Sequence, residues 1–226
     1  MATHLVTGAG SGIGAVLADR LLERGDEVYL LARSTERAHD LRADLPAATV
    51  LVADLADAAA VEAVAGRLPA SLDSVVHAAG VVDLGTVAEL TTDAWQSQLA
   101  VNLVAPAVLT RLCLPALRSA RGTVVFVNSG AGLVAHPRWS AYAASKFGLR
   151  ALADSLRAEE LEHGVRVTTV FPGRTATAMQ EKVHEQEGKD YDAGDWIDPA
   201  TVVDAILHVL DLPDDATISD LTIRPR

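Results

Sequence analysis

A glycine-rich turn between a short strand and a helix limits the fold of this chain more than any other segment. Residues 3–7 favour a strand, residues 8–14 (GAGSGIG) favour a turn, and residues 15–24 have the apolar period of a helix. Such a turn lets backbone amides approach a phosphate, and the helix N-terminus adds partial positive charge. A glycine cluster alone also forms plain tight turns, so the flanking strand and helix are what favour phosphate binding here.

Strand-like and helix-like segments alternate along the rest of the chain. The strand-like segments are short and apolar, as is typical of strands buried on both faces of a parallel sheet. This alternation predicts one doubly wound parallel α/β sheet with helices on both faces, and 226 residues suffice for one such domain, residues 1–226. We expect further strands at 27–32, 49–53, 72–77, 122–128, 165–171 and 217–223, and helices at 35–44, 57–67, 92–117, 139–163 and 199–210.

Tyr142 and Lys146 are four residues apart in a predicted helix, so their side chains lie on one face. A tyrosine with a pKa of about 10 is a poor acid or base at neutral pH, and a nearby ammonium lowers that pKa. Ser129 follows the strand predicted at 122–128, at the sheet edge where open α/β folds bind ligands. A YxxxK pair alone is more typical of two surface residues on an amphipathic helix, but the rest of the chain favours a reaction site.

Together, these segments resemble the short-chain dehydrogenase/reductase family over essentially the whole chain. Residues 7–14 resemble its TGxxxGxG turn, and residues 172–177 resemble its PGxxxT turn. The resemblance implies a Rossmann-like sheet of seven strands in the order 3-2-1-4-5-6-7. The residues that match the family's catalytic tetrad are Asn102, Ser129, Tyr142 and Lys146.

The resemblance implies an NAD(P) cofactor, and the end of the second strand favours NADP(H), with NAD(H) as the alternative. An acid there would bind the ribose hydroxyls, whereas Ala32 is neutral and Arg33 offers a fork of donors to a 2′-phosphate. Arg33 is also typical of a solvated loop, and Ser11 is neutral where many NADP-binding members carry a base. No metal is expected. The cofactor-binding residues that the resemblance implies are Gly8, Ser11, Gly12, Ile13, Gly14, Arg33, Asp54, Leu55, Ala79, Gly80, Tyr142, Lys146, Pro172, Gly173, Thr175 and Thr177.

Two segments depart from the family's pattern. His77 and Ala78 replace the two asparagines of its NNAG turn, which puts the bracing of the central strand in doubt. Ala105 replaces the glycine of the NxxG motif that starts at Asn102. The resemblance implies that Asn102 holds a water in a proton relay, whereas an asparagine in an apolar helix is equally typical of a structural polar residue with a buried partner.

The function that the resemblance implies is hydride transfer between NADP(H) and a small or medium carbonyl or secondary alcohol substrate. Tyr142 would be the general acid, Ser129 would orient the carbonyl oxygen, and Lys146 would lower the pKa of Tyr142 and hold the nicotinamide ribose. Two alternatives stay open: an NAD-linked alcohol dehydrogenase working in the oxidative direction, and a non-catalytic dinucleotide-binding regulator with the same fold.

The sequence does not specify the substrate. Residues 178–197 resemble the family's mobile substrate lid, and their excess of acidic residues disfavours docking of an acidic carrier protein. Arg138 and Arg174 would instead bind a small carboxylate if both lined the mouth of the site. Candidates to line the pocket, each equally typical of ordinary packing, are Leu133, His136, Trp139 and Met179.

The formal net charge of −11 argues against nucleic acid or an anionic membrane as a partner. The single cysteine, Cys113, cannot form an intrachain disulfide and fits a buried thiol in a reducing compartment. We find no signal-peptide pattern and no apolar run of about eighteen residues, and therefore expect a cytoplasmic location. The resemblance implies a homodimer or homotetramer, with helices 92–117 and 139–163 packing across a two-fold axis.

Overall fold

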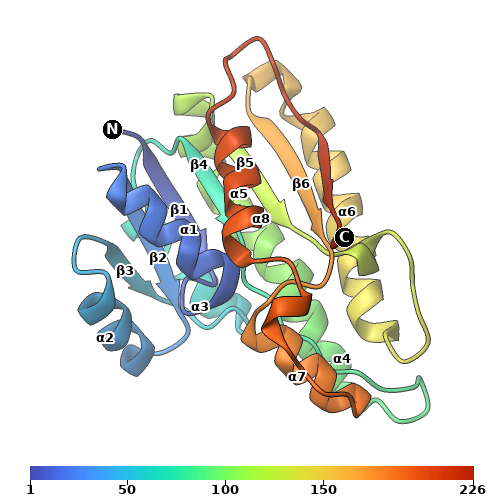
Figure 1. Ribbon diagram of the computed structural model, residues 1–226. Coiled ribbons are helices and arrows are strands. Elements are labelled where there is room, and N and C mark those ends of the chain that lie inside the picture. Colours follow the sequence, from blue (N-terminus) through green and yellow to red (C-terminus); the bar gives the residue numbers. More distant parts are fainter.

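A parallel sheet of seven strands in the order β3-β2-β1-β4-β5-β6-β7 forms the centre of the computed structural model, which describes residues 1–226 (Figure 1). All six neighbouring strand pairs are parallel. The predicted fold class and strand order are therefore confirmed. The strands are β1 (Thr3–Thr7), β2 (Glu27–Ala32), β3 (Thr49–Val52), β4 (Ser74–His77), β5 (Thr123–Val127), β6 (Arg166–Pro172) and β7 (Asp220–Ile223).

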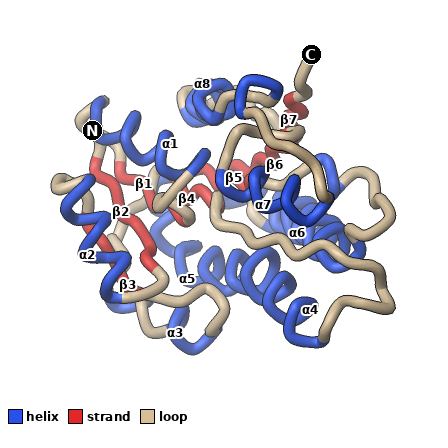
Figure 2. The backbone as a smooth tube through the Cα atoms, turned by 60° about the horizontal axis from the view of Figure 1, so that its bottom comes forward, coloured by secondary structure: helices blue, strands red, loops and turns tan.

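Helices cover both faces of the sheet and enclose two separate apolar cores (Figure 2). One face is covered by α1 (Gly12–Glu23), α2 (Thr35–Asp44) and α8 (Pro199–Leu210). The other is covered by α3 (Ala58–Glu62), α5 (Ala105–Ala120) and α6 (Ser140–Glu159). Two further helices, α4 (Thr92–Leu99) and α7 (Ala178–Glu187), complete the fold.

The apolar face of α5 shows why these helices pack where they do. Leu109, Cys113 and Leu117 follow one another at intervals of four residues and are fully buried against the sheet. Burial raises the pKa of the Cys113 thiol to about 12, so the thiol stays protonated and unreactive. The prediction of a buried, structural cysteine is confirmed.

The helix predicted at 92–117 is interrupted just before Pro106. A π-helical turn, Ala100–Val104, separates α4 from α5. Pro106 lies in the first turn of α5, and because α5 continues directly from the π turn, its missing N–H leaves a carbonyl of the preceding turn without that donor. Pro115 lies inside α5 on its exposed side, where water can satisfy the carbonyl that proline leaves unpaired. The interruption includes Asn102, which lies in the π turn.

Other element ends also differ from the predictions. Helix α1 begins at Gly12, three residues earlier than expected, so the glycine-rich turn forms its first turn. The helix expected at 57–67 stops at Glu62 and continues as a 3₁₀ turn, Ala65–Arg67, around Gly66. Glycine loses more backbone conformational entropy in a helix than other residues do, so it is common where helices end.

Thr92–Ala120 is long and apolar enough to cross a membrane by length and composition, contrary to the expectation that no segment would qualify. Its buried side chains belong to the core beneath the sheet. Packing against the sheet accounts for part of the apolar composition of this segment, in which 44% of an apolar stretch of 18 residues is buried.

The buried side chain of His77 should make the stability of the fold sensitive to acid. It is buried at the end of β4, where Nε2 lies 2.8 Å from Thr110 Oγ1 and the ring stacks on Phe126. Burial lowers the pKa of His77 to about 3. The unfolded chain therefore binds a proton at His77 more readily than the folded chain does. The contribution of neutral His77 to folding stability is complete above about pH 6.5 and is lost as the pH falls towards 3. Between pH 7 and pH 5 this one group should lower the free energy of unfolding by about 2 kcal/mol.

Urea unfolding at the two pH values tests this expectation. His77→Asn should lose that part of the pH dependence, whatever it does to stability at pH 7. His208→Asn is the matched control, because His208 is exposed on α8. An unchanged pH dependence in His77→Asn would show that His77 does not titrate differently on unfolding.

Candidate active site

A cavity of about 1140 Å³ opens at the carboxyl edge of the sheet, bounded by the turns after the first six strands, by α6 and by α7. All the residues predicted to bind the cofactor line it except Gly14. Of the predicted catalytic residues, Ser129, Tyr142 and Lys146 line the cavity, and Asn102 lies buried behind it. The chain thus brings together residues from the turn after its first strand and Arg224, which follows its last strand.

The glycine-rich turn leaves the cavity open where side chains would fill it. Gly8 and Gly12 adopt left-handed backbone conformations, with φ of +75° and +57°. A Cβ at Gly14 would come within 2.4 Å of the Gly8 carbonyl oxygen, so Gly14 serves close packing and not ligand contact. With α1 starting at Gly12, its free N–H groups are directed at this end of the cavity. This cradle fits a dinucleotide phosphate.

Tyr142 and Lys146 lie one turn apart on the buried face of α6, with side-chain exposures of only 5% and 3%. The Lys146 Nζ lies 5.7 Å from the centre of the Tyr142 ring and donates to the Val127 carbonyl over 3.0 Å. Ser129 lies at the end of β5, and its hydroxyl accepts a hydrogen bond from Ala131 N. The predicted helical pairing and the position of the serine are both present.

The protonation of this pair differs from the prediction. Burial raises the pKa of Tyr142 to about 12, and a hydrogen bond with Ser129 offsets only part of that rise. Burial also lowers the pKa of Lys146 to about 8. We expected Lys146 to lower the pKa of the phenol, but desolvation dominates because both groups are removed from water. A phenol that keeps its proton is suited to act as an acid.

Two positioning residues were not predicted from the sequence. The buried Asn128 donates through Nδ2 to the Lys146 carbonyl over 3.0 Å and accepts from Ser129 N over 2.8 Å, so one side chain fixes α6 relative to the serine. The Ser145 hydroxyl donates to the Tyr142 carbonyl over 2.7 Å and accepts from Asn102 Nδ2. A polar residue at the end of an otherwise apolar strand was the available signal for Asn128.

The end of the central strand is braced without the family's two asparagines. Asn102 pairs with both the N–H and the carbonyl of Val81, each over 2.9 Å. The Thr7 hydroxyl accepts from Ala79 N over 3.1 Å, which links β1 to the turn after β4. These bonds, with the contact between His77 and Thr110, supply the bracing that the sequence left in doubt.

A second arginine joins Arg33 at the ribose end of the cavity. Arg37, in the first turn of α2, lines the cavity and donates through Nη2 to the Gly10 carbonyl over 3.4 Å. Its other terminal nitrogen pairs with Asp40. Arg37 therefore occupies the space beside Ser11 that a base in the glycine-rich turn would fill. Its position four residues after Arg33, at the start of a helix, was the signal that the sequence offered.

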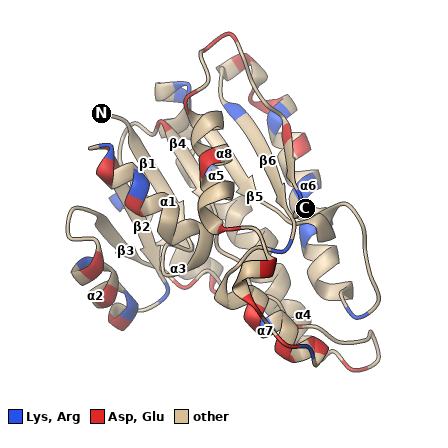
Figure 3. Ribbon diagram, viewed as in Figure 1, with Lys and Arg blue, Asp and Glu red and all other residues tan.

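The predicted lid is a helix, α7, that covers the substrate end of the cavity. Met179 and Val183 of α7 pack against Val82 and Tyr142, which gives that end an apolar wall. Lys182 pairs with Asp83 over 2.6 Å and ties α7 to the loop after β4. In Figure 3, which colours the ribbon by residue type, acidic positions are frequent along α7. The acidic lid residues Glu181, Glu185, Asp190, Asp192 and Asp195 are exposed to solvent.

The remaining pocket candidates divide into two groups. His136, Trp139, Met179 and Arg174 line the cavity. Leu133 and Arg138 do not, so the two arginines do not act together as a carboxylate site.

Comparisons with known proteins agree with this site. The family profile described as short chain dehydrogenase matches residues 2–188. The chain is 33% identical over 236 residues to the glycine betaine reductase ATRR of Emericella nidulans, covering 98% of this chain but only 18% of that longer protein. It is similar to a metagenomic short-chain oxidoreductase in complex with NADP, with a TM-score of 0.81, 30% identity, and coverage of 100% and 97% of the two chains.

A second solved structure, 4-hydroxyisoleucine dehydrogenase complexed with NADH, has a TM-score of 0.87 and 26% identity, over 100% of this chain and 98% of that one. The family match, the fold and the cavity therefore agree. The chain belongs to the short-chain dehydrogenase/reductase family and is an oxidoreductase that acts through NAD(P).

Proposed function

We propose that this protein interconverts a small or medium carbonyl compound and the corresponding alcohol with NADP(H). The observation that carries the proposal is the joint position of Ser129, Tyr142 and Lys146 in one cavity with a glycine-rich phosphate cradle. A dinucleotide-binding regulator would have no use for a buried, protonated phenol beside a serine hydroxyl. These residues therefore favour an enzyme over the regulator.

The bound cofactor supplies the hydride in the direction of reduction. Tyr142 donates its proton to the carbonyl oxygen as negative charge develops there, and its pKa of about 12 keeps that proton in place at neutral pH. The Ser129 hydroxyl binds and orients the same oxygen. Lys146, with a pKa of about 8, is mostly protonated at neutral pH and can hold the nicotinamide ribose.

NADP(H) is the preferred cofactor in this proposal. Arg33 is exposed at the end of β2 without an acid at Ala32, and Arg37 adds a second guanidinium beside the glycine-rich turn. Two guanidinium groups at one end of the cavity, each able to donate paired N–H hydrogen bonds, suit a 2′-phosphate. The two similar solved structures carry NADP in one case and NADH in the other, so the preference rests on these arginines.

The experiment that tests the function is a screen of aldehydes, ketones and secondary alcohols with NADPH, NADH and their oxidised forms. Turnover is followed by the absorbance of the reduced nicotinamide. Carbonyl reduction that is faster with NADPH supports the proposal. Activity confined to alcohol oxidation with NAD would favour the alternative dehydrogenase, and tight cofactor binding without turnover would favour the regulator.

We also propose a homodimer or homotetramer located in the cytoplasm, formed through α5 and α6. Val104 and Phe147, on the neighbouring helical segments, are 44% and 41% exposed, and apolar side chains of this size gain from burial in an interface. Light scattering at micromolar concentration should give a mass above that of one chain, and Phe147→Asp should reduce it. Leu161→Asp, at an exposed leucine beyond the end of α6, is the control. A monomeric wild type would contradict this proposal.

A further inference from the structure

Two arginines line the substrate end of the cavity, and the proposed reaction uses neither. Arg174 follows Gly173 in the turn after β6, and Arg224 lies in the short tail after β7, whose end lies near the carboxyl end of β6 (Figure 1). Arg224 lies beside Gly130, the residue after Ser129, because a Cβ on Gly130 would come within 2.8 Å of its Nη1. Both arginines therefore line the one cavity, Arg174 from the turn after β6 and Arg224 from the segment after β7.

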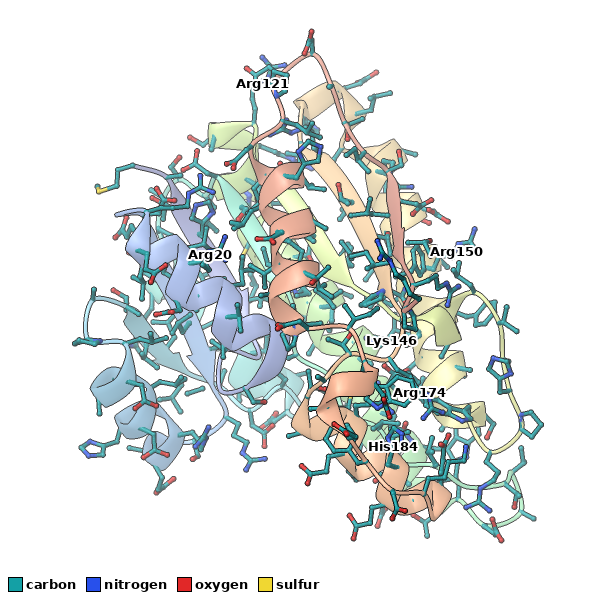
Figure 4. All side chains as sticks on the ribbon, viewed as in Figure 1. Arg20, Arg121, Lys146, Arg150, Arg174 and His184 are labelled. Atoms are coloured by element: carbon teal, nitrogen blue, oxygen red, sulfur yellow. The ribbon has the colours of Figure 1, made fainter.

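The Arg174 side chain is held in a fixed orientation. Its Nη2 donates to Glu187 Oε1 over 2.7 Å, and the guanidinium lies over the Trp196 ring, 5.4 Å from its centre. His184 Nε2 lies 3.5 Å from its Nη1, and in Figure 4 Arg174 lies between Lys146 and His184. A guanidinium has five N–H donors, so the bond to Glu187 leaves others free to bind a ligand.

The cavity is basic although the chain is acidic. Five basic side chains and two acidic ones line it, against a formal charge of −11 for the whole protein. Arg33 and Arg37 belong to the ribose end, and Lys146 belongs to the catalytic pair. At the substrate end, Arg174 and Arg224 remain, with Glu187 as their acidic neighbour. A cleft lined by charges of one sign raises the local concentration of ligands with the opposite charge.

From this arrangement we infer that the substrate carries a carboxylate, bound by Arg174 and Arg224 while the oxygen of its carbonyl group faces Tyr142. The inference rests on the proposed function and narrows it to short oxo acids and the corresponding hydroxy acids. The apolar wall of Val82 and Val183 suits the short aliphatic chain between the two groups. A singly charged carboxylate is favoured over a phosphate, because Glu187 beside Arg174 repels a dianion more strongly.

The test compares 4-oxobutanoate with its methyl ester, using NADPH. The two compounds share the aldehyde and the chain, so the ratio of their kcat/KM values isolates the carboxylate. A charge-assisted contact predicts that wild type prefers the acid by about tenfold or more, and that Arg174→Met and Arg224→Met each lower the acid-to-ester ratio by about tenfold. Arg224 is exposed and has no acidic partner within ion-pair distance, so its replacement leaves the fold intact.

Arg150→Met is the matched control, because Arg150 lies on α6 outside the cavity (Figure 4) and its loss removes the same charge. It should leave the acid-to-ester ratio unchanged. An ester used as well as the acid by wild type, or equal falls of the ratio in Arg150→Met and Arg224→Met, would overturn the inference while leaving the proposed function standing. Failure to reduce any carbonyl with either cofactor would contradict the proposed function itself.

Discussion

Tyr142→Phe should reduce carbonyl turnover by about 10²-fold or more, the usual contribution of a positioned acid. The substitution removes the only phenol in the cavity and keeps the ring, which packs with Val82 and Val183. The fold and the cofactor site should therefore survive, and the loss should appear in kcat. No neighbouring group replaces the donor well, because Lys146 is directed at the Val127 carbonyl.

Steady-state kinetics and cofactor titration by fluorescence measure the two halves of this expectation. Tyr29→Phe is the matched control: it also removes a single phenol, but Tyr29 lies on β2, and its hydroxyl bonds to Glu27 outside the cavity. Near-normal turnover in Tyr142→Phe would rule out Tyr142 as the acid. If the variant lost cofactor affinity by the same factor as turnover, the role of Tyr142 would be cofactor binding and not proton donation.

Wild type should prefer NADPH over NADH by about tenfold to a hundredfold in kcat/KM, because a charge-assisted pair with phosphate is worth roughly 1.5–3 kcal/mol. Replacing Ala32 with Asp and Arg33 with Ser should reverse the preference, since the new carboxylate binds the ribose hydroxyls and repels a 2′-phosphate. Arg37→Ser alone should weaken NADPH binding and leave NADH nearly unaffected.

Steady-state kinetics of wild type and the variants with NADPH and with NADH test these expectations. Arg20→Ser is the control, because Arg20 lies on α1, pairs with Asp204 at the surface and does not line the cavity (Figure 4). Equal kcat/KM values for NADPH and NADH in wild type would show that Arg33 and Arg37 are solvated surface residues. A larger effect of Arg37→Ser than of the double replacement would make Arg37 the main determinant.

The sheet could be predicted from the sequence because its signals are local. Strands such as β5 are uninterrupted apolar runs that suit only a position buried on both faces, and glycine-rich or polar turns mark their ends. Parallel strands joined by helices then allow few arrangements. The boundaries of β1, β2, α2 and α8 agree with the prediction.

The parts that could not be predicted depend on contacts between distant residues. Whether Asn128 bonds to Lys146, or Arg37 to Gly10, depends on how α6 and α2 pack, and sequence spacing carries no such information. The π turn contains Asn102, whose side chain pairs with Val81 on another segment, and the sequence alone does not indicate that pairing. The raised pKa of Tyr142 likewise reflects its burial, to which Val183 of the lid contributes, and burial cannot be read from the spacing to Lys146.

The way the cavity is assembled has a consequence for how the protein matures. The residues that line the cavity range from Gly8 to Arg224. Strand β1 pairs with β4, about seventy positions further along the chain. During synthesis, the cofactor cradle can form when the first four strands have emerged, but the turn after β6 and the segment around Arg224 are made later. Catalytic competence should therefore appear only after these later residues have been made, and enzyme activity can serve as a measure of how far the sheet has folded.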